Sequence, residues 1–163
     1  MSTKDRTFTT RIDIDLDTRE QLIGLLNTHL ASTLDLYAQT KHAHWNVKGH
    51  DFFQLHELFD TLAAPLLDYV DMYGERITAL GGTAHGSIRT ASETSILPDL
   101  DTPDDAGSTY LAALSERFAM LASATREAID LSASLNDQAT ADLFTEVVRG
   151  LDKHLYFLEA HLR

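Results

Sequence analysis

The feature that most constrains the fold is a set of four long segments in which apolar residues recur every three or four positions. This spacing is typical of helices that bury one face. The predicted helices span about 17–46, 51–80, 104–133 and 137–161, with Thr18 as the expected cap of the first and Phe52 on the apolar side of the second. Helix breakers are few, since the 163 residues include only 8 glycines and 3 prolines. The sequence therefore predicts an all-α chain of four long helices.

The connections between these helices follow a short–long–short order. The turn signals gather in 81–105, where a short extra helical turn is expected at about 90–95. A connection of that length can cross a bundle from one end to the other. We therefore expect a four-helix bundle with one long crossover, the ferritin-like arrangement, as a single domain over 1–163 with an N-terminal tail over 1–16.

Composition narrows the classes of function. The absence of cysteine excludes disulfides, iron–sulfur clusters, thiolate zinc sites and cysteine nucleophiles. With 25 acidic against 13 basic residues and a formal net charge of −12, the chain repels phosphate backbones and attracts cations. Neither a secretory signal nor an apolar run of about 20 residues is visible, so we expect a cytoplasmic protein without membrane contact.

The second predicted helix carries His56, Asp60, Asp71 and Glu75 on one face. At about 100° per residue the four lie within an arc of roughly 100°. The first pair is nevertheless about 22 Å from the second along the axis, at 1.5 Å per residue. One metal ion cannot bind both pairs of a single chain. A two-fold dimer with antiparallel second helices would permit two equivalent sites between the chains.

His44 lies at the end of the first predicted helix. A tight turn at Gly49 would bring it toward His56 and Asp60, and a mixed set of imidazole and carboxylate ligands suits Fe(II). Ferritin-type centres inside one bundle use Glu-x-x-His motifs, which this sequence lacks. These observations favour a site between chains over one inside the bundle.

Other interpretations of the same residues stay open. A histidine and an aspartate four positions apart on a helix commonly form a solvated surface pair, and Asp71 with Glu75 fits an exposed acidic face. The set also fits a structural zinc site or a plain polar interface. Trp45 fits a core or interface anchor as well as a residue near a redox centre.

Over essentially its whole length, the chain resembles the Dps family, the DNA-binding proteins from starved cells or mini-ferritins. The resemblance rests on the run 42–49 (His-Ala-His-Trp-Asn-Val-Lys-Gly), on the two spaced His/Asp and Asp/Glu pairs, and on Leu80-Gly81-Gly82. It implies a hollow homododecamer with ferroxidase centres at two-fold interfaces. The ligands it implies are His44, His56 and Asp60 from one subunit and Asp71 and Glu75 from its partner.

The resemblance also implies what these centres do. Such proteins oxidise Fe(II) to Fe(III), typically with hydrogen peroxide, store the ferric mineral in the cavity and so protect DNA. Trp45 matches a tryptophan beside the centre. For an acidic entry pore we expect Asp130, Asp137 and Asp142, near the turn between the third and fourth predicted helices.

DNA binding is the alternative function, in which the cage mainly compacts the nucleoid and the metal site is incidental. DNA-binding members usually carry a tail rich in lysine and arginine. Here the N-terminal tip offers only Lys4, Arg6 and Arg11, and three aspartates follow at 13, 15 and 17. We therefore expect weak DNA binding at most, dependent on low salt or on the avidity of twelve copies.

Overall fold

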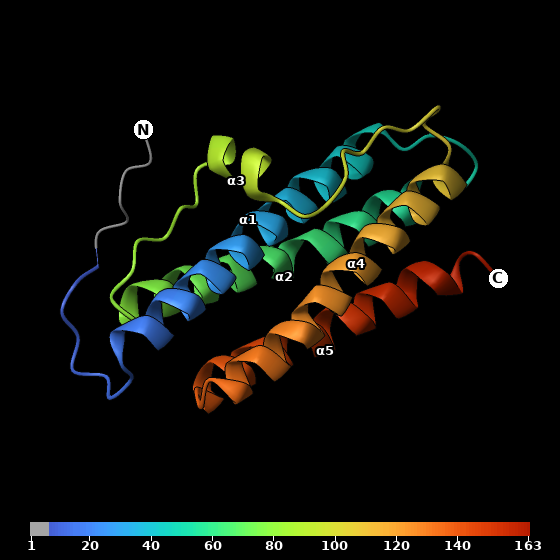
Figure 1. Cartoon of the computed structure of the whole chain (residues 1–163). Helices are drawn as coiled ribbons and strands as arrows, with labels where there is room; N and C mark the ends of the chain where they lie inside the picture. Colours follow the sequence, from blue (N-terminus) through green and yellow to red (C-terminus); the bar gives the residue numbers. More distant parts are fainter. Residues whose placement is uncertain (1–6) are drawn as a thin grey trace.

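A computed structural model describes residues 7–163, which form helices and connecting loops. The helices are α1 (Leu16–Asn46), α2 (Phe52–Ala79), α3 (Ile88–Thr94), α4 (Gly107–Ser134) and α5 (Gln138–Ala160). The pairs α1–α2 and α4–α5 are antiparallel hairpins that pack against each other (Figure 1). The connection from α2 to α4 passes through α3 beside α1 and runs the length of the bundle (Figure 1). The predicted all-α ferritin-like bundle with one long crossover is confirmed.

The predicted helix bounds lie within a few residues of the observed ones, and the short extra turn is α3. The first helix differs in its cap, because Asp15 and not Thr18 is the N-cap residue. The Asp15 carboxylate accepts both the backbone N–H of Thr18, at 2.9 Å, and its hydroxyl, at 2.8 Å. Such a cap satisfies a backbone donor that the helix leaves free, and it also lowers the pKa of Asp15.

The core is continuous between the two hairpins and is built from the predicted apolar faces. Large side chains from all four long helices are fully buried, and burial of each contributes about 1.5–3 kcal/mol. Those with no or almost no exposed surface include Leu22, Leu26, Phe59, Leu62, Leu66, Tyr73, Tyr110, Phe118 and Phe144. Phe52 is an exception to the predicted apolar face of α2, since 42% of it is exposed. Pro65 lies within α2 without ending it.

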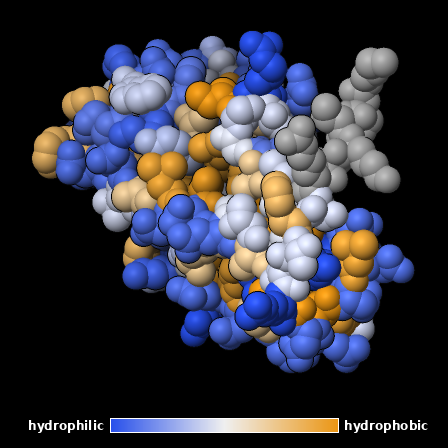
Figure 2. Space-filling view, turned by 90° about the vertical axis from the view of Figure 1, so that its left-hand side faces the viewer, coloured by the Kyte–Doolittle hydropathy of each residue, from blue (hydrophilic) through white to orange (hydrophobic). Residues whose placement is uncertain are grey.

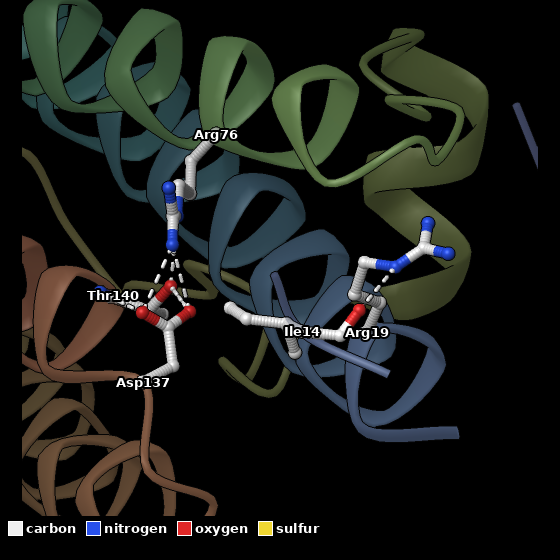
Figure 3. Close-up of polar contacts among 5 residues, drawn as sticks. All are labelled: Ile14, Arg19, Arg76, Asp137 and Thr140. Carbon is white, nitrogen blue, oxygen red and sulfur yellow. Dashed lines mark hydrogen bonds and ion pairs between the residues drawn. The ribbon is translucent and has the colours of Figure 1, made fainter. Parts of the chain in front are cut away.

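An ion pair between the partly buried Arg76 and the buried Asp137 joins the two hairpins (Figure 3). Arg76 of α2 donates from Nη2 to both carboxylate oxygens of Asp137, at 2.9 and 2.8 Å, and from Nε to the hydroxyl of Thr140. Asp137 also caps α5 by accepting the Thr140 N–H. Burial opposes the charged form, but the hydrogen bonds from Thr140 and Arg76 outweigh it and lower the pKa of Asp137.

The segment before α1 is attached to the end of α2. Arg19 donates to the carbonyl of Ile14 at 3.1 Å (Figure 3) and to that of Leu80 at 2.8 Å. Phe8 N–H donates to the carbonyl of Gly81 at 2.7 Å. Gly81 has a φ of +87°, and a Cβ at this position would lie 2.4 Å from the Phe8 carbonyl oxygen, so glycine is required here.

The surface near this segment is mainly hydrophilic, with separate apolar patches (Figure 2). Among residues 7–163, no helix is both long and apolar enough to cross a membrane.

Candidate metal centre

His44 and His56 hold each other in place where α1 ends and α2 begins. Nδ1 of His44 lies 2.7 Å from the backbone oxygen of His56, and Nδ1 of His56 lies 2.8 Å from the backbone oxygen of His44. The two rings stack, with centroids 3.7 Å apart and planes inclined by 21°. The connection between the helices turns at Gly49, whose φ of +114° suits glycine.

This reciprocal arrangement determines the tautomer of both rings. A carbonyl oxygen only accepts hydrogen bonds, so each Nδ1 must carry the proton. In a neutral imidazole the other nitrogen, Nε2, then has a free lone pair, which is the form that binds metal ions. Hydrogen bonds of this kind also fix the orientation of ligating rings. The fold therefore presents two oriented imidazoles suited to metal binding.

Asp60 lies one turn beyond His56 on α2, and its side chain is 56% exposed. Its carboxylate accepts a hydrogen bond from Lys41 of α1, with 2.5 Å between Nζ and Oδ1. This hydrogen bond lowers the pKa of Asp60, and the positive charge of Lys41, with that of His44 and His56 when they are protonated, lowers it further. Asp60 thus lies near both histidines, while its direct partner is Lys41.

Asp71 and Glu75 are exposed on α2, about four and five turns beyond His56. Within residues 7–163, no three His, Asp or Glu side chains of one chain lie close enough together to hold a metal ion. The structure therefore brings His44 and His56 together and places Asp60 near them, hydrogen-bonded to Lys41. It does not bring Asp71 or Glu75 to the histidine pair.

Aromatic residues neighbour the histidine pair on both helices. Trp45 is 64% exposed, and the Lys41 ammonium lies 5.7 Å from its ring centroid. The ring of Phe52 lies 5.2 Å from that of His56, and the neighbouring Phe53 is 67% exposed. Exposed aromatic groups beside a half-built polar site are typical of surfaces that another protein covers.

The remaining predicted residues occupy different environments. Asp137 is buried against Arg76 and caps α5, so its carboxylate is not free to line a channel. Asp130 and Asp142 are exposed, and their place in a pore stays a prediction. Arg11 is exposed, while Lys4 and Arg6 lie outside the described residues, so the suggested DNA contacts also stay predictions.

Sequence reasoning missed Lys41 and the two backbone carbonyls that orient the histidines. The position of Lys41, three residues before His44, puts both on one face of α1 and is a signal that could have found it. The carbonyl contacts depend on the approach of two helix ends, and no residue pattern predicts them.

Comparisons with known protein families, sequences and structures all match ferritin-like or Dps proteins. A family described as ferritin-like domain matches residues 23–163. The chain is 43% identical over 158 residues to a DNA protection during starvation protein from Agrobacterium fabrum, over 97% of this chain and 98% of the relative. DpsC from Streptomyces coelicolor superposes with a TM-score of 0.92 at 29% identity, over 97% of this chain and 92% of that one.

A Dps protein from Vibrio cholerae, described as a member of a broad superfamily of ferritin-like diiron-carboxylate proteins, superposes with a TM-score of 0.88 at 26% identity. The match spans 95% of this chain and 97% of that one. These relatives support iron storage and DNA protection as the general function. The chain belongs to the Dps family of ferritin-like proteins.

Proposed function

We propose that this protein oxidises Fe(II) at sites shared between two subunits and stores the ferric product in a cage of twelve copies, thereby protecting DNA. The observation that carries the proposal is the reciprocal pairing of His44 and His56, which leaves two Nε2 lone pairs available. Two imidazoles with carboxylates form a ligand set that suits Fe(II). Iron is the substrate and the cargo of this reaction.

The second chain supplies what one chain lacks. In a two-fold dimer with antiparallel α2 helices, His44, His56 and Asp60 of one protomer face the partner's Asp71 and Glu75. Carboxylates bind Fe(III) more strongly than Fe(II), because oxygen ligands prefer the more highly charged ion. A site of this kind therefore favours oxidation as well as binding.

The oxidant in this proposal is hydrogen peroxide. Each Fe(II) gives up one electron, so two Fe(II) ions reduce one peroxide, whose O–O bond breaks to yield two hydroxide ions. Fe(III) then hydrolyses to an insoluble ferric hydroxide and releases protons. Because both electrons reach one peroxide, hydroxyl radical does not accumulate, and this is how the reaction protects DNA.

The test is peroxide-driven iron oxidation in cages that mix two defective subunits. We expect His44→Ala/His56→Ala cages and Asp71→Ala/Glu75→Ala cages to oxidise iron no faster than buffer. A dimer with one subunit of each variant has two shared sites. One of these sites carries all four substitutions, and the other carries none. Random co-assembly should therefore restore about a quarter of the wild-type number of sites.

The measurement follows ferric absorbance and hydroxyl radical together after a peroxide pulse to Fe(II)-loaded, oxygen-free protein. Glu127→Ala, which removes an exposed carboxylate on α4, is the control and should leave the rate unchanged. Wild-type rates in the Asp71→Ala/Glu75→Ala cages, or no recovery in assembled mixed cages, would contradict the shared site. Metal binding without any oxidation would favour a structural zinc site.

DNA compaction is a second candidate function, favoured by the names of the relatives and by the exposed Arg11. A gel shift at moderate salt, with and without residues 1–11, separates it from protection by iron oxidation. Retardation that is lost on truncation would support direct DNA binding.

A further inference from the structure

Lys41 contacts two groups that belong to the candidate metal centre. Its ammonium lies 2.5 Å from Oδ1 of Asp60 and 5.7 Å from the ring centroid of Trp45. Its side chain is only 17% exposed, although the Asp60 side chain is 56% exposed. Lys41 is thus a largely covered cation whose charge is directed at the carboxylate that iron would use.

A cation in this place competes with a metal ion. A divalent ion bound by His44, His56 and Asp60 would lie a few ångströms from the ammonium, where two positive charges repel each other. The oxygen of Asp60 that accepts the Lys41 hydrogen bond is also less available as a ligand.

Trp45 offers the ammonium a second position. A lysine ammonium within about 6 Å of a tryptophan ring centroid is attracted to the ring face, and Lys41 already lies within that range. Lys41 can therefore leave Asp60 for the neighbouring aromatic face without being released fully into water. Lys41 and Trp45 lie four residues apart on α1, which keeps them together.

We propose that Lys41 is a positioning residue that gates the metal centre: it holds Asp60 in the metal-free protein, and a divalent ion binds only as the ammonium moves from Asp60 toward Trp45. This inference rests on the proposed function, because it takes Asp60 as a ligand. It adds that the Lys41 ammonium competes with the divalent ion for Asp60 and so lowers the affinity of the centre. It also adds that the ammonium moves toward Trp45, whose fluorescence can report this movement.

The first test is the affinity for Zn(II) of the assembled protein, measured by calorimetry for the wild type, Lys41→Met and Lys41→Arg. We expect Lys41→Met to bind Zn(II) about tenfold more tightly, equivalent to about 1.4 kcal/mol. Lys41→Arg keeps the cation and should remain close to the wild type. Lys48→Met is the matched control, since the Lys48 ammonium bonds to the Asn46 carbonyl and not to a ligand.

The second readout is the fluorescence of Trp45, the only tryptophan in the chain. Zn(II) has a filled d shell and no redox chemistry, so a change in emission reflects the surroundings of the ring. We expect Zn(II) to shift the emission of the wild type and of Lys48→Met, and to leave that of Lys41→Met unchanged. A purely structural role for Lys41 would not produce this pattern.

Unchanged or weaker Zn(II) binding in Lys41→Met, or the same emission shift in Lys41→Met as in the wild type, would overturn the gate. If Lys41→Met fails to assemble, Lys41→Gln takes its place with the same expected results. His44→Ala/His56→Ala distinguishes the two proposals. If it binds Zn(II) as the wild type does, the assignment of the centre is wrong. If it does not bind and Lys41→Met is unchanged, only the gate is wrong.

Discussion

The two ends of α2 contribute to the candidate centre in different ways. At its start, His56 and its partner His44 are largely covered, stacked and hydrogen-bonded through both Nδ1 atoms. Toward its end, Asp71 and Glu75 are exposed on the helix surface. The difference teaches that the imidazoles are held in fixed orientations while the carboxylates stay exposed, so in the proposed site one chain would supply the ligand geometry and its partner the negative charge. The next three predictions test this division, from the largest expected effect to the smallest.

We expect the largest effect from the ion pair between Arg76 and Asp137, which lies next to Glu75 near the end of α2. Asp137→Ala leaves the partly buried Arg76, the neighbour of Glu75, without its counterion and removes the α5 cap. We expect a loss of about 3 kcal/mol in the free energy of unfolding. Chemical denaturation at matched protomer concentration measures it. Asp142→Ala, an exposed carboxylate on the same helix, should cost far less. Equal losses would show that the buried pair is not special.

The second effect concerns the rigid end. The two rings stack on each other, so His44→Ala or His56→Ala removes one ligand and also the packing of the remaining ring, whose Nδ1 keeps its backbone carbonyl partner. We expect each single variant to weaken Zn(II) binding about 100-fold, and the double variant to be little worse than either. Calorimetric titration measures this, with the exposed His50→Ala as the control. Additive losses would mean that the two rings act independently.

The smallest effect contrasts these histidines with one inside the core. His29 donates from Nδ1 to the Leu25 carbonyl at 2.9 Å, and its ring packs against Phe144 and Tyr73. Burial lowers the pKa of His29 below the ordinary 6.5. The unfolded chain therefore binds this proton more readily, and stability falls as the pH drops below about 6.5 toward the lower folded value.

His29→Gln removes this titrating group. The free energy of unfolding should then change less between pH 7 and pH 5, by about 1 kcal/mol. Some dependence should remain, because burial also lowers the pKa of His154. The comparison is made by denaturation at each pH, with His50→Gln as the exposed control. If the free energy of unfolding of His29→Gln depends on pH as steeply as that of the wild type, His29 does not cause the loss of stability at low pH.

Much of the fold was predictable because it depends on local pattern. Helical periodicity located all four long helices, and turn residues located the crossover and α3. The cap of α1 was misplaced because Asp15 and Thr18 are both good capping residues, and only the backbone geometry distinguishes them. Phe52 was placed in the core because periodicity does not distinguish a face that packs within the chain from one left exposed.

The candidate centre was predictable in its residue types but not in its contacts. The pairing of His44 with His56 followed from a short turn between two helices. Lys41 with Asp60 and Arg76 with Asp137 are pairs between side chains 19 and 61 residues apart. Such pairs depend on how two helices pack against each other. The sequence pattern alone does not give the distance between the helices.

The division into two hairpins has a consequence for the order of folding. Contacts between helices gather within α1–α2 and within α4–α5, each made from segments adjacent in the chain. Contacts between nearby segments form quickly, whereas the docking of the hairpins must wait for the long crossover to close. On a ribosome, the first hairpin emerges before the second is synthesised. The imidazole pair should thus be among the earliest tertiary contacts of the nascent chain.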